Sequence, residues 1–305
     1  MAADIKRIIG ETWRYNLHAH SQFCDGRDTM AAIADAARRE GMRYFAFTPH
    51  SPVPIKSPCN MSKDKMEEYI VEAARLRDRH RPDMEILTSL EIDWLGPDWG
   101  PHIDYFQHLP LDFRLGSVHF VPNQDGVLLD CDGKFERFAT YLKDGYAGDL
   151  RYVVEKYFEQ VLTMLERGGF DLLGHFDKIA GNASIADPGI EDHGWYEALV
   201  DDVVEHVKGT DVVVEVNTKA FADKGRFFPA ERWWGKLIDA GIRLAVDSDA
   251  HYASKVSAGR SEAFSRLENL VRSKKNTNFA AVFADMPVPI MGRDMQSGVN
   301  QINNN

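Results

Sequence analysis

Short apolar segments alternate with segments of helical periodicity along most of this 305-residue chain. The strand-like segments cover residues 14–18, 43–48, 84–90, 113–118, 170–174, 212–216 and 242–246. Helix-like segments separate them, for example residues 29–40, 62–81 and 150–167. Parallel strands need long crossover connections, which are usually helices. The alternation therefore predicts an α/β fold with seven strands, and a chain of this length can form it as a single domain.

Side chains able to bind a metal ion stand at or just after the end of nearly every strand-like segment. They are His18, His20, His50, Glu91, His119, His175, Asp249 and His251. The other five of the eleven histidines lie in helix-like or loop segments. In barrel folds the carboxyl ends of the strands meet on one face, so these side chains are expected to converge. Imidazole and carboxylate ligands together suit Zn²⁺, Mn²⁺ or Fe²⁺ better than Mg²⁺.

Each of these side chains also has a simpler interpretation. His50 could be a loop histidine, His175 could bond to Asp177, and Glu91 could pair with a lysine on a helix. Eight polar groups gathered at one end of the strands without a partner would, however, leave buried charges unpaired, at several kcal/mol each. The set as a whole therefore predicts a metal centre.

Several short motifs surround these ligands. They are His18-Ala19-His20, Asp25 in the following turn, Thr48-Pro49-His50-Ser51, Glu91, Ser117-Val118-His119, Gly174-His175-Phe176-Asp177 and Ser248-Asp249-Ala250-His251. In this order they resemble the polymerase-and-histidinol-phosphatase (PHP) superfamily of metallophosphoesterases, over about residues 14–264. The resemblance implies a distorted seven-stranded (β/α) barrel. We expect this catalytic domain to span residues 1–275 and residues 276–305 to form a partly disordered C-terminal extension.

The resemblance also implies two to three divalent ions, with zinc, manganese and iron as candidates. One ion would bind His18, His20, Glu91 and Asp249, a second Glu91, His119 and His175, and a third Asp25, His50 and His251. Members of the family often carry histidine at the place of Asp25.

Three motifs resemble the histidinol-phosphate phosphatase branch of this superfamily. They are Phe47-Thr48-Pro49-His50-Ser51, Gly116-Ser117-Val118-His119-Phe120 and Glu215-Val216-Asn217-Thr218. This branch implies hydrolysis of L-histidinol phosphate to L-histidinol and phosphate, a step of histidine biosynthesis. Two alternatives remain open: a PHP enzyme acting on another phosphomonoester, a phosphodiester or phosphotyrosine, and a PHP domain without enzymatic activity. Other metal-dependent hydrolase barrel families usually carry a carboxylated lysine after a middle strand, and no lysine is suitably placed for that role.

The expected mechanism is in-line attack on phosphorus by a hydroxide bridging the metal ions. Arg226 is the preferred phosphate ligand, because a guanidinium matches phosphate geometry. Lys178, Lys219 and Asn217 complete the predicted substrate-binding set, and Asp249 or His251 would manage the proton of the leaving group. Four further acids, Asp93, Asp98, Asp130 and Asp132, could receive a cationic substrate or be exposed loop acids.

The charge and the composition of the chain limit the kinds of partner and cellular location that are expected. The formal net charge of −11 argues against nucleic acid, since phosphate backbones attract basic surfaces. No apolar run approaches the ~20 residues of a membrane span, and the first residues lack the apolar core of a signal peptide. Three cysteines at unrelated spacings predict no disulfide framework and favour a cytoplasmic location. A small phosphate ester is the expected partner, and the sequence leaves the oligomeric state open.

Overall fold

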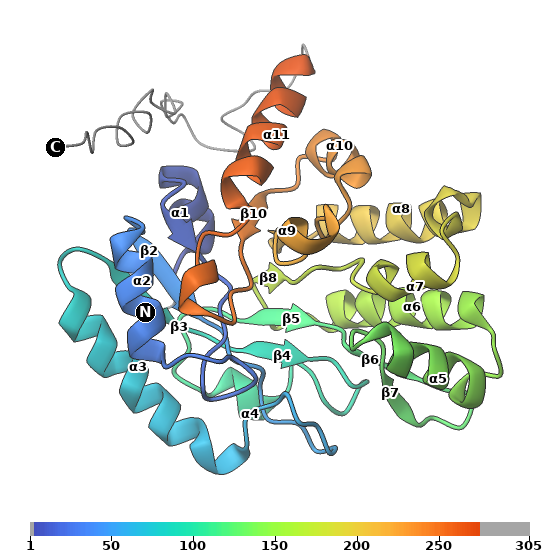
Figure 1. The fold of residues 1–305 in the computed structure, drawn as a ribbon, viewed down its shortest axis with the longest axis horizontal. Coiled ribbons are helices and arrows are strands. Elements are labelled where there is room, and N and C mark those ends of the chain that lie inside the picture. Colours follow the sequence, from blue (N-terminus) through green and yellow to red (C-terminus); the bar gives the residue numbers. More distant parts are fainter. Residues whose placement is uncertain (1–2, 275–305) are drawn as a thin grey trace, which may run out of the picture.

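The computed structural model describes residues 3–274, which form one mixed α/β domain (Figure 1). Its strands are β1 (Tyr15–Asn16), β2 (Tyr44–Phe47), β3 (Glu85–Thr88), β4 (Glu91–Asp93), β5 (Leu115–Ser117), β6 (Phe120–Pro122), β7 (Leu128–Asp130), β8 (Leu172–Leu173), β9 (Val213–Asn217) and β10 (Leu244–Asp247). Its α-helices are α1 (Ile5–Glu11), α2 (Met30–Arg39), α3 (Met66–His80), α4 (Asp104–Gln107), α5 (Phe135–Gly145), α6 (Leu150–Arg167), α7 (Ala180–Ala186), α8 (Gly194–Lys208), α9 (Phe221–Lys224), α10 (Glu231–Asp239) and α11 (Arg260–Ser273). Short 3₁₀ turns lie at Lys63–Lys65, Ile190–Asp192 and Ala253–Lys255.

The strands form two parallel sheets and one antiparallel hairpin. The sheets have the orders β1-β2-β3 and β10-β9-β8-β5-β4, and β6 pairs with β7. Two parallel bridges link the two sheets. Ala19↔Ala250 joins residues that follow β1 and β10, and His50↔Glu91 joins a residue that follows β2 to the first residue of β4. The predicted α/β class with parallel strands is confirmed, whereas closure into a barrel stays a prediction.

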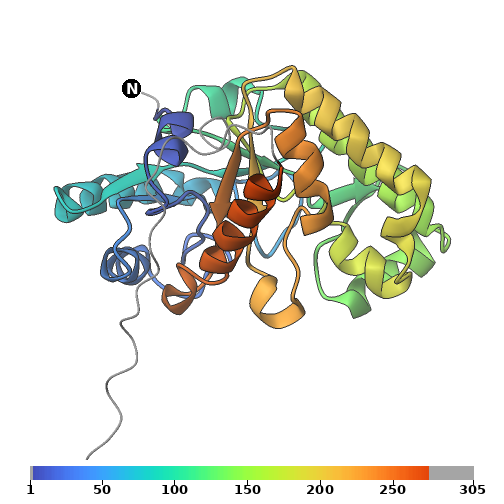
Figure 2. The ribbon, with the colours of Figure 1, turned by 90° about the horizontal axis from the view of Figure 1, so that it is seen from above.

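Helices flank the strands on both sides. In Figure 1, α2 and α3 lie on one side and α5, α6, α7 and α8 on the other, and Figure 2 shows the same arrangement from above. Most strand residues are buried on both faces, as expected for parallel strands covered by helices. The covered strands give the carboxyl ends, where the loops begin, a rigid support.

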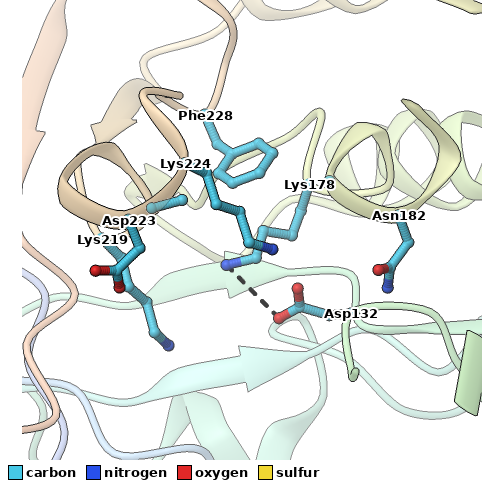
Figure 3. Close-up of a pocket in the computed structure, with 9 residues that line it drawn as sticks. Asp132, Lys178, Asn182, Lys219, Asp223, Lys224 and Phe228 are labelled. Carbon is cyan, nitrogen blue, oxygen red and sulfur yellow. Dashed lines mark ion pairs between the residues drawn. The ribbon is translucent and has the colours of Figure 1, made fainter. Parts of the chain in front are cut away.

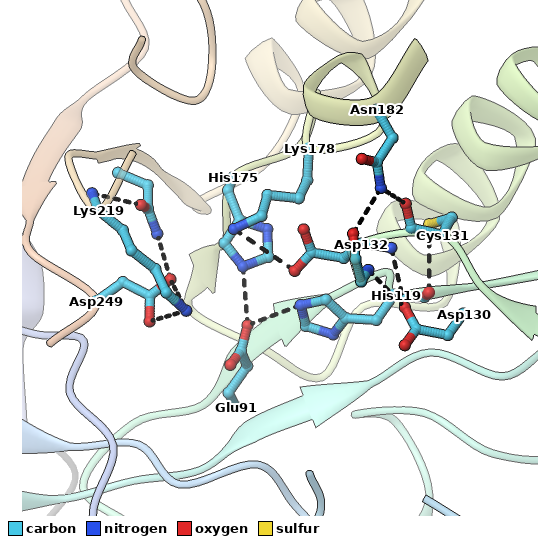
Figure 4. A network of polar contacts seen from close by, with 12 residues as sticks. Glu91, His119, Asp130, Cys131, Asp132, His175, Lys178, Asn182, Lys219 and Asp249 are labelled. Carbon is cyan, nitrogen blue, oxygen red and sulfur yellow. Dashed lines mark hydrogen bonds and ion pairs between the residues drawn. The ribbon is translucent and has the colours of Figure 1, made fainter. Parts of the chain in front are cut away.

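The region between β5 and α6 contains the β6–β7 hairpin, which is not among the predicted strand-like segments, and α5. The hairpin turn is closed by Asn123, whose Oδ1 accepts hydrogen bonds from the backbone N–H groups of Asp125 (3.0 Å) and Val127 (2.8 Å). Strands of three residues are too short to show a period of alternation, which is why the sequence pattern missed them. The hairpin places the turn that follows β7 beside the carboxyl ends of the parallel strands (Figure 4).

The predicted strand over residues 84–90 is divided in the structure. β3 pairs with β2, and β4 begins at Glu91 and pairs with β5. Glu91 is thus the first residue of a new strand segment instead of the residue after a strand end. The predicted extension, residues 276–305, lies outside the described residues. Among residues 3–274 no helix combines the length and apolar character needed to span a membrane.

Candidate metal centre

Glu91 occupies the middle of a cluster of histidines at the carboxyl ends of the parallel strands. Its carboxylate is 1% exposed and lies within 3.5 Å of five imidazoles. The contacts are to His18 Nε2 (3.3 Å), His20 Nε2 (3.3 Å), His50 Nδ1 (3.2 Å), His119 Nε2 (3.5 Å) and His175 Nε2 (3.0 Å). These histidines follow β1, β2, β5 and β8, so residues far apart in the sequence meet at one point, part of which Figure 4 shows.

The first predicted ligand group is compact. His20 Nε2 lies 3.1 Å from His18 Nε2 and 3.2 Å from Asp249 Oδ1, and both imidazoles approach Glu91 Oε2. All four side chains are at most 3% exposed. Two imidazole nitrogens and two carboxylate oxygens at this spacing are donors that suit Zn²⁺, Mn²⁺ or Fe²⁺.

The other predicted ligands adjoin this group. His119 and His175 both face Glu91 Oε1, which is the predicted second group. Asp25 Oδ2 lies 3.3 Å from His251 Nε2, and Asp25 Oδ1 lies 3.9 Å from His50 Nε2, as in the third group. His50 stands between the groups, because its Nδ1 faces Glu91. Its ring also forms a possible ligand set with His119 and Asp93, a residue that the prediction did not include among the ligands.

Two buried atoms in this centre support metal binding. Asp25 Oδ1 and His50 Nδ1 make no hydrogen bond within the part of the chain that the structure describes. Buried polar atoms are usually hydrogen-bonded, and an ion is one of the partners that explains an exception. The donor set and these atoms therefore fit divalent ions.

Two carboxylates that the metal prediction overlooked orient two of the predicted ligand histidines through the ring nitrogen on the side away from Glu91. Glu215 Oε1 lies 2.6 Å from His18 Nδ1, and Asp93 Oδ1 lies 2.6 Å from His119 Nδ1. A carboxylate on one ring nitrogen fixes the tautomer and directs the other nitrogen to a metal. A charged residue inside the apolar run of β9 was the signal for Glu215 in the sequence. Its pairing with a residue near the start of the chain was not predictable from spacing.

Two of the predicted ligand residues have a backbone conformation that is rare for non-glycine residues. His175 has φ of 20° and Asp249 has φ of 47°. Glu215 helps to hold one of them, because its Oε2 accepts a hydrogen bond from the backbone N–H of His175 at 2.8 Å. Strained positions of this kind cluster at functional sites, where the surrounding structure enforces them.

Without metal, nearby carboxylates raise the pKa of some of the clustered imidazoles, among them His18 and His119, whereas burial lowers the pKa of His50 and His175. Burial would lower the pKa of His18, but the neighbouring carboxylates, led by Glu215, outweigh it and raise the pKa to about 10. For His119, burial is likewise outweighed by Glu91 and Asp93, and the pKa rises to about 9. In the metal-free protein, both rings are therefore protonated on both nitrogens and positively charged at pH 7.

We expect the affinity for divalent metal to increase with pH between pH 6 and pH 8. A metal ion needs the unprotonated nitrogen, so it displaces a proton from each such ring, and each displaced proton strengthens binding about tenfold per pH unit. Competition with a chromophoric chelator, measured with Zn²⁺ at several pH values, gives the slope. A pH-independent affinity would show that these imidazoles do not bind the ion.

Three lysines lie near the rim of the metal centre. Lys219 Nζ lies 3.1 Å from His251 Nε2 and 3.4 Å from the Asp249 carboxylate. Lys219 and Lys224 line a cavity of about 370 Å³ that opens onto His50 and His119. Both also line an adjoining cavity of about 240 Å³, together with Lys178 (Figure 3). These lysines place positive charge where an anionic substrate would approach.

Arg226, the preferred phosphate ligand of the sequence analysis, is not brought to this rim. Its guanidinium donates to both carboxylate oxygens of Glu191, at 2.7 and 2.9 Å, and lies 3.6 Å from Asp177. It lines neither of the two cavities beside the metal centre. The structure thus gives Arg226 the role of tying the loop after β9 to the turn at Ile190–Asp192.

Replacing Arg226 with alanine is expected to destabilise the fold by about 2–4 kcal/mol, because it leaves two largely buried carboxylates without their cation. The turnover of the folded protein should change less than about fivefold. Urea unfolding and steady-state kinetics on the same preparations separate the two effects. A hundredfold loss of turnover with unchanged stability would return Arg226 to the substrate site.

Asn217, predicted to bind substrate, lies in the second layer around the centre. Its Nδ2 donates to Asp249 Oδ2 at 3.1 Å, and its Oδ1 accepts from the backbone N–H of Lys219 at 3.1 Å. The side chain is fully buried and lines neither cavity. It therefore orients one predicted ligand and one cationic residue.

Known proteins resemble this chain in sequence and in fold. A family model described as the PHP domain matches residues 16–219. A probable histidinol-phosphatase of Schizosaccharomyces pombe is 24% identical over 82% of this chain and 85% of its own length. A histidinol-phosphatase of Bacillus subtilis is 26% identical over 48% of this chain and 58% of its own length. The crystal structure of a Lactococcus lactis histidinol phosphate phosphatase, complexed with zinc, L-histidinol and phosphate, superposes with a TM-score of 0.65. It is 19% identical and covers 84% of this chain and 93% of the other.

Proposed function

Because this chain belongs to the PHP domain family, we propose that it is a metal-dependent phosphatase that hydrolyses L-histidinol phosphate to L-histidinol and phosphate. The observation that carries the proposal is the convergence of five imidazoles on the Glu91 carboxylate, with lysines at the rim. Relatives that align over most of this chain bear the same activity in their names. The resemblance that the motifs predicted is confirmed by the family match.

The proposed cofactors are two to three divalent ions, of which zinc is the ion in the Lactococcus lactis complex. The nine predicted ligands would hold them: His18, His20, Asp25, His50, Glu91, His119, His175, Asp249 and His251. When bound, such ions neutralise charge that develops on phosphoryl oxygens and make water more acidic. Manganese and iron suit the same donors.

The chain's own residues then have separate tasks. Lys219 and Lys178 bind phosphate oxygens from the two cavities, which stabilises the charge of the transition state. Asp249 or His251, which lie beside Lys219, would transfer a proton to the leaving alcohol. Glu215 and Asp93 keep His18 and His119 in the orientation that these steps require.

We further infer that the two parallel sheets close into the expected distorted barrel. Counting β3 and β4 as one divided strand gives seven strands in the order of the pairings. The bridge Ala19↔Ala250 and the hydrogen bond from the His20 N–H to Ala250 O (2.8 Å) support closure between β1 and β10.

One panel of assays tests the function. Protein purified without chelators is analysed for metals and assayed with histidinol phosphate, other phosphomonoesters, a phosphodiester and a phosphotyrosine peptide. We expect between two and three equivalents of metal and the highest kcat/KM for histidinol phosphate. Preferential hydrolysis of a phosphodiester or of the phosphotyrosine peptide would contradict the proposal.

A further inference from the structure

The two cavities beside the metal centre have Asp132 as a common wall. Its carboxylate lines both the cavity that opens onto His50 and His119 and the adjoining one around Lys178 (Figure 3). The residue lies in the turn after β7, so it reaches the centre from outside the parallel sheets. A group at this place contacts any leaving group that extends from one cavity into the other.

The turn that carries Asp132 is held firmly. The Asn182 side chain, on α7, donates to the carbonyl oxygens of Cys131 and Gly133, both at 2.9 Å (Figure 4). On the other side, the backbone N–H of Cys131 donates to His119 O at 2.9 Å. The turn is therefore fixed both to α7 and to a predicted metal ligand. Such support places a recognition residue more accurately than a free loop does.

Among the four acids that the sequence offered for a cationic substrate, Asp132 is the one that lines both cavities and has no strong partner. Of the four acids proposed for a cationic substrate, Asp93 is bonded to a ligand histidine and an asparagine, and Asp130 is paired with an arginine. Asp98 is exposed and lines neither cavity. Within residues 3–274 the carboxylate of Asp132 has one ion pair, with Lys178 Nζ at 3.6 Å. That distance is too long for a good hydrogen bond, so both groups retain their capacity to bind a ligand.

We infer that Asp132 binds the ammonium group of the substrate and thereby selects phosphate esters of 2-amino alcohols. The inference rests on the proposed function. In such an ester the ammonium is on the carbon next to the CH₂–O–phosphate group, so a cation and an anion stand side by side. Lys178 and Asp132 present the opposite pair, an ammonium for the phosphate and a carboxylate for the amine. Matching of charges in this way contributes specificity, because an ester without the amine leaves the carboxylate unpaired.

The test compares Asp132→Asn with the wild-type enzyme on two substrates. One is histidinol phosphate, and the other is 3-(imidazol-4-yl)propyl phosphate, which lacks only the amine. For the variant, kcat/KM for histidinol phosphate should fall about tenfold to a hundredfold, as for loss of a charged hydrogen bond. For the analogue it should change less than about twofold, which also shows that the variant is folded and holds its metal.

The matched control is Asp223→Asn, an exposed acid on the other side of the Lys178 cavity. It should leave the ratio of the two kcat/KM values unchanged. An equal fall for both substrates in Asp132→Asn would overturn the inference and make Asp132 a positioning residue for Lys178. A changed ratio in Asp223→Asn alone would overturn it in favour of Asp223. A wild-type enzyme that hydrolyses neither ester would overturn the proposed function itself.

Discussion

Replacing Glu91 with alanine should lower kcat by about a thousandfold or more and remove more than one equivalent of metal. Its carboxylate lies within 3.5 Å of five imidazoles, and it is shared by two of the three proposed ligand groups. Loss of a residue that only supports a ligand costs about ten- to a hundredfold, and a shared ligand should cost more. Without the Glu91 carboxylate, the site loses one negative charge that would balance the charge of the divalent ions, so the remaining histidines bind these ions more weakly.

Elemental analysis and kcat measured on the same sample check this result. Glu85→Ala is the matched control, because Glu85 is an exposed glutamate of the adjoining β3 and should leave both quantities unchanged. A Glu91→Ala protein that keeps its full metal content would show that the ions do not share this carboxylate.

Replacing Lys219 with glutamine should lower kcat/KM for histidinol phosphate about a hundredfold. Lys219 Nζ lies beside His251 and Asp249, at the rim where the phosphoryl group has to meet the centre. A donor that stabilises transition-state charge is worth about a hundred- to a thousandfold when removed. Metal content should not change, because the lysine is not one of the proposed ligands. The inhibition constant for inorganic phosphate should rise with the loss of activity.

Two further variants test whether the effect depends on the charge and the position of Lys219. Lys219→Arg keeps the charge and should recover part of the activity. Lys208→Gln removes an exposed lysine at the end of α8 and should behave as the wild type. Unchanged phosphate inhibition in Lys219→Gln would assign phosphate binding to Lys178, the buried lysine of the neighbouring cavity.

The predicted ligands converge because their positions follow from a simple rule. A residue just after a parallel strand lies at the carboxyl edge of the sheet, so His18, His119 and His175 could be placed without knowing any contact. Glu91 was predicted for the right location although it begins β4, because the divided strand still runs through the same edge.

The loop residues could not be placed in this way. Arg226 follows β9 at a distance from which a guanidinium can point in several directions, and its partner Glu191 comes from another loop. The roles of Glu215 and Asp93 depend on a second residue far away in the sequence, and no local pattern encodes that pairing. The same holds for Asp132, which reaches the centre only because the unpredicted β6–β7 hairpin carries it there.

Asp249 and His251 contact His18 and His20 from the other end of the domain, and this has a consequence for the synthesis of the protein. Domains emerge from the ribosome with the N-terminal end first, and Asp249 and His251 come after all the other predicted ligands in the sequence. A nascent chain that presents His18, His20 and Glu91 still lacks Asp249, which lies 3.2 Å from His20 Nε2 in the finished fold. We therefore expect stable metal loading to follow synthesis, and partly made chains to lose a metal ion readily to cellular chelators.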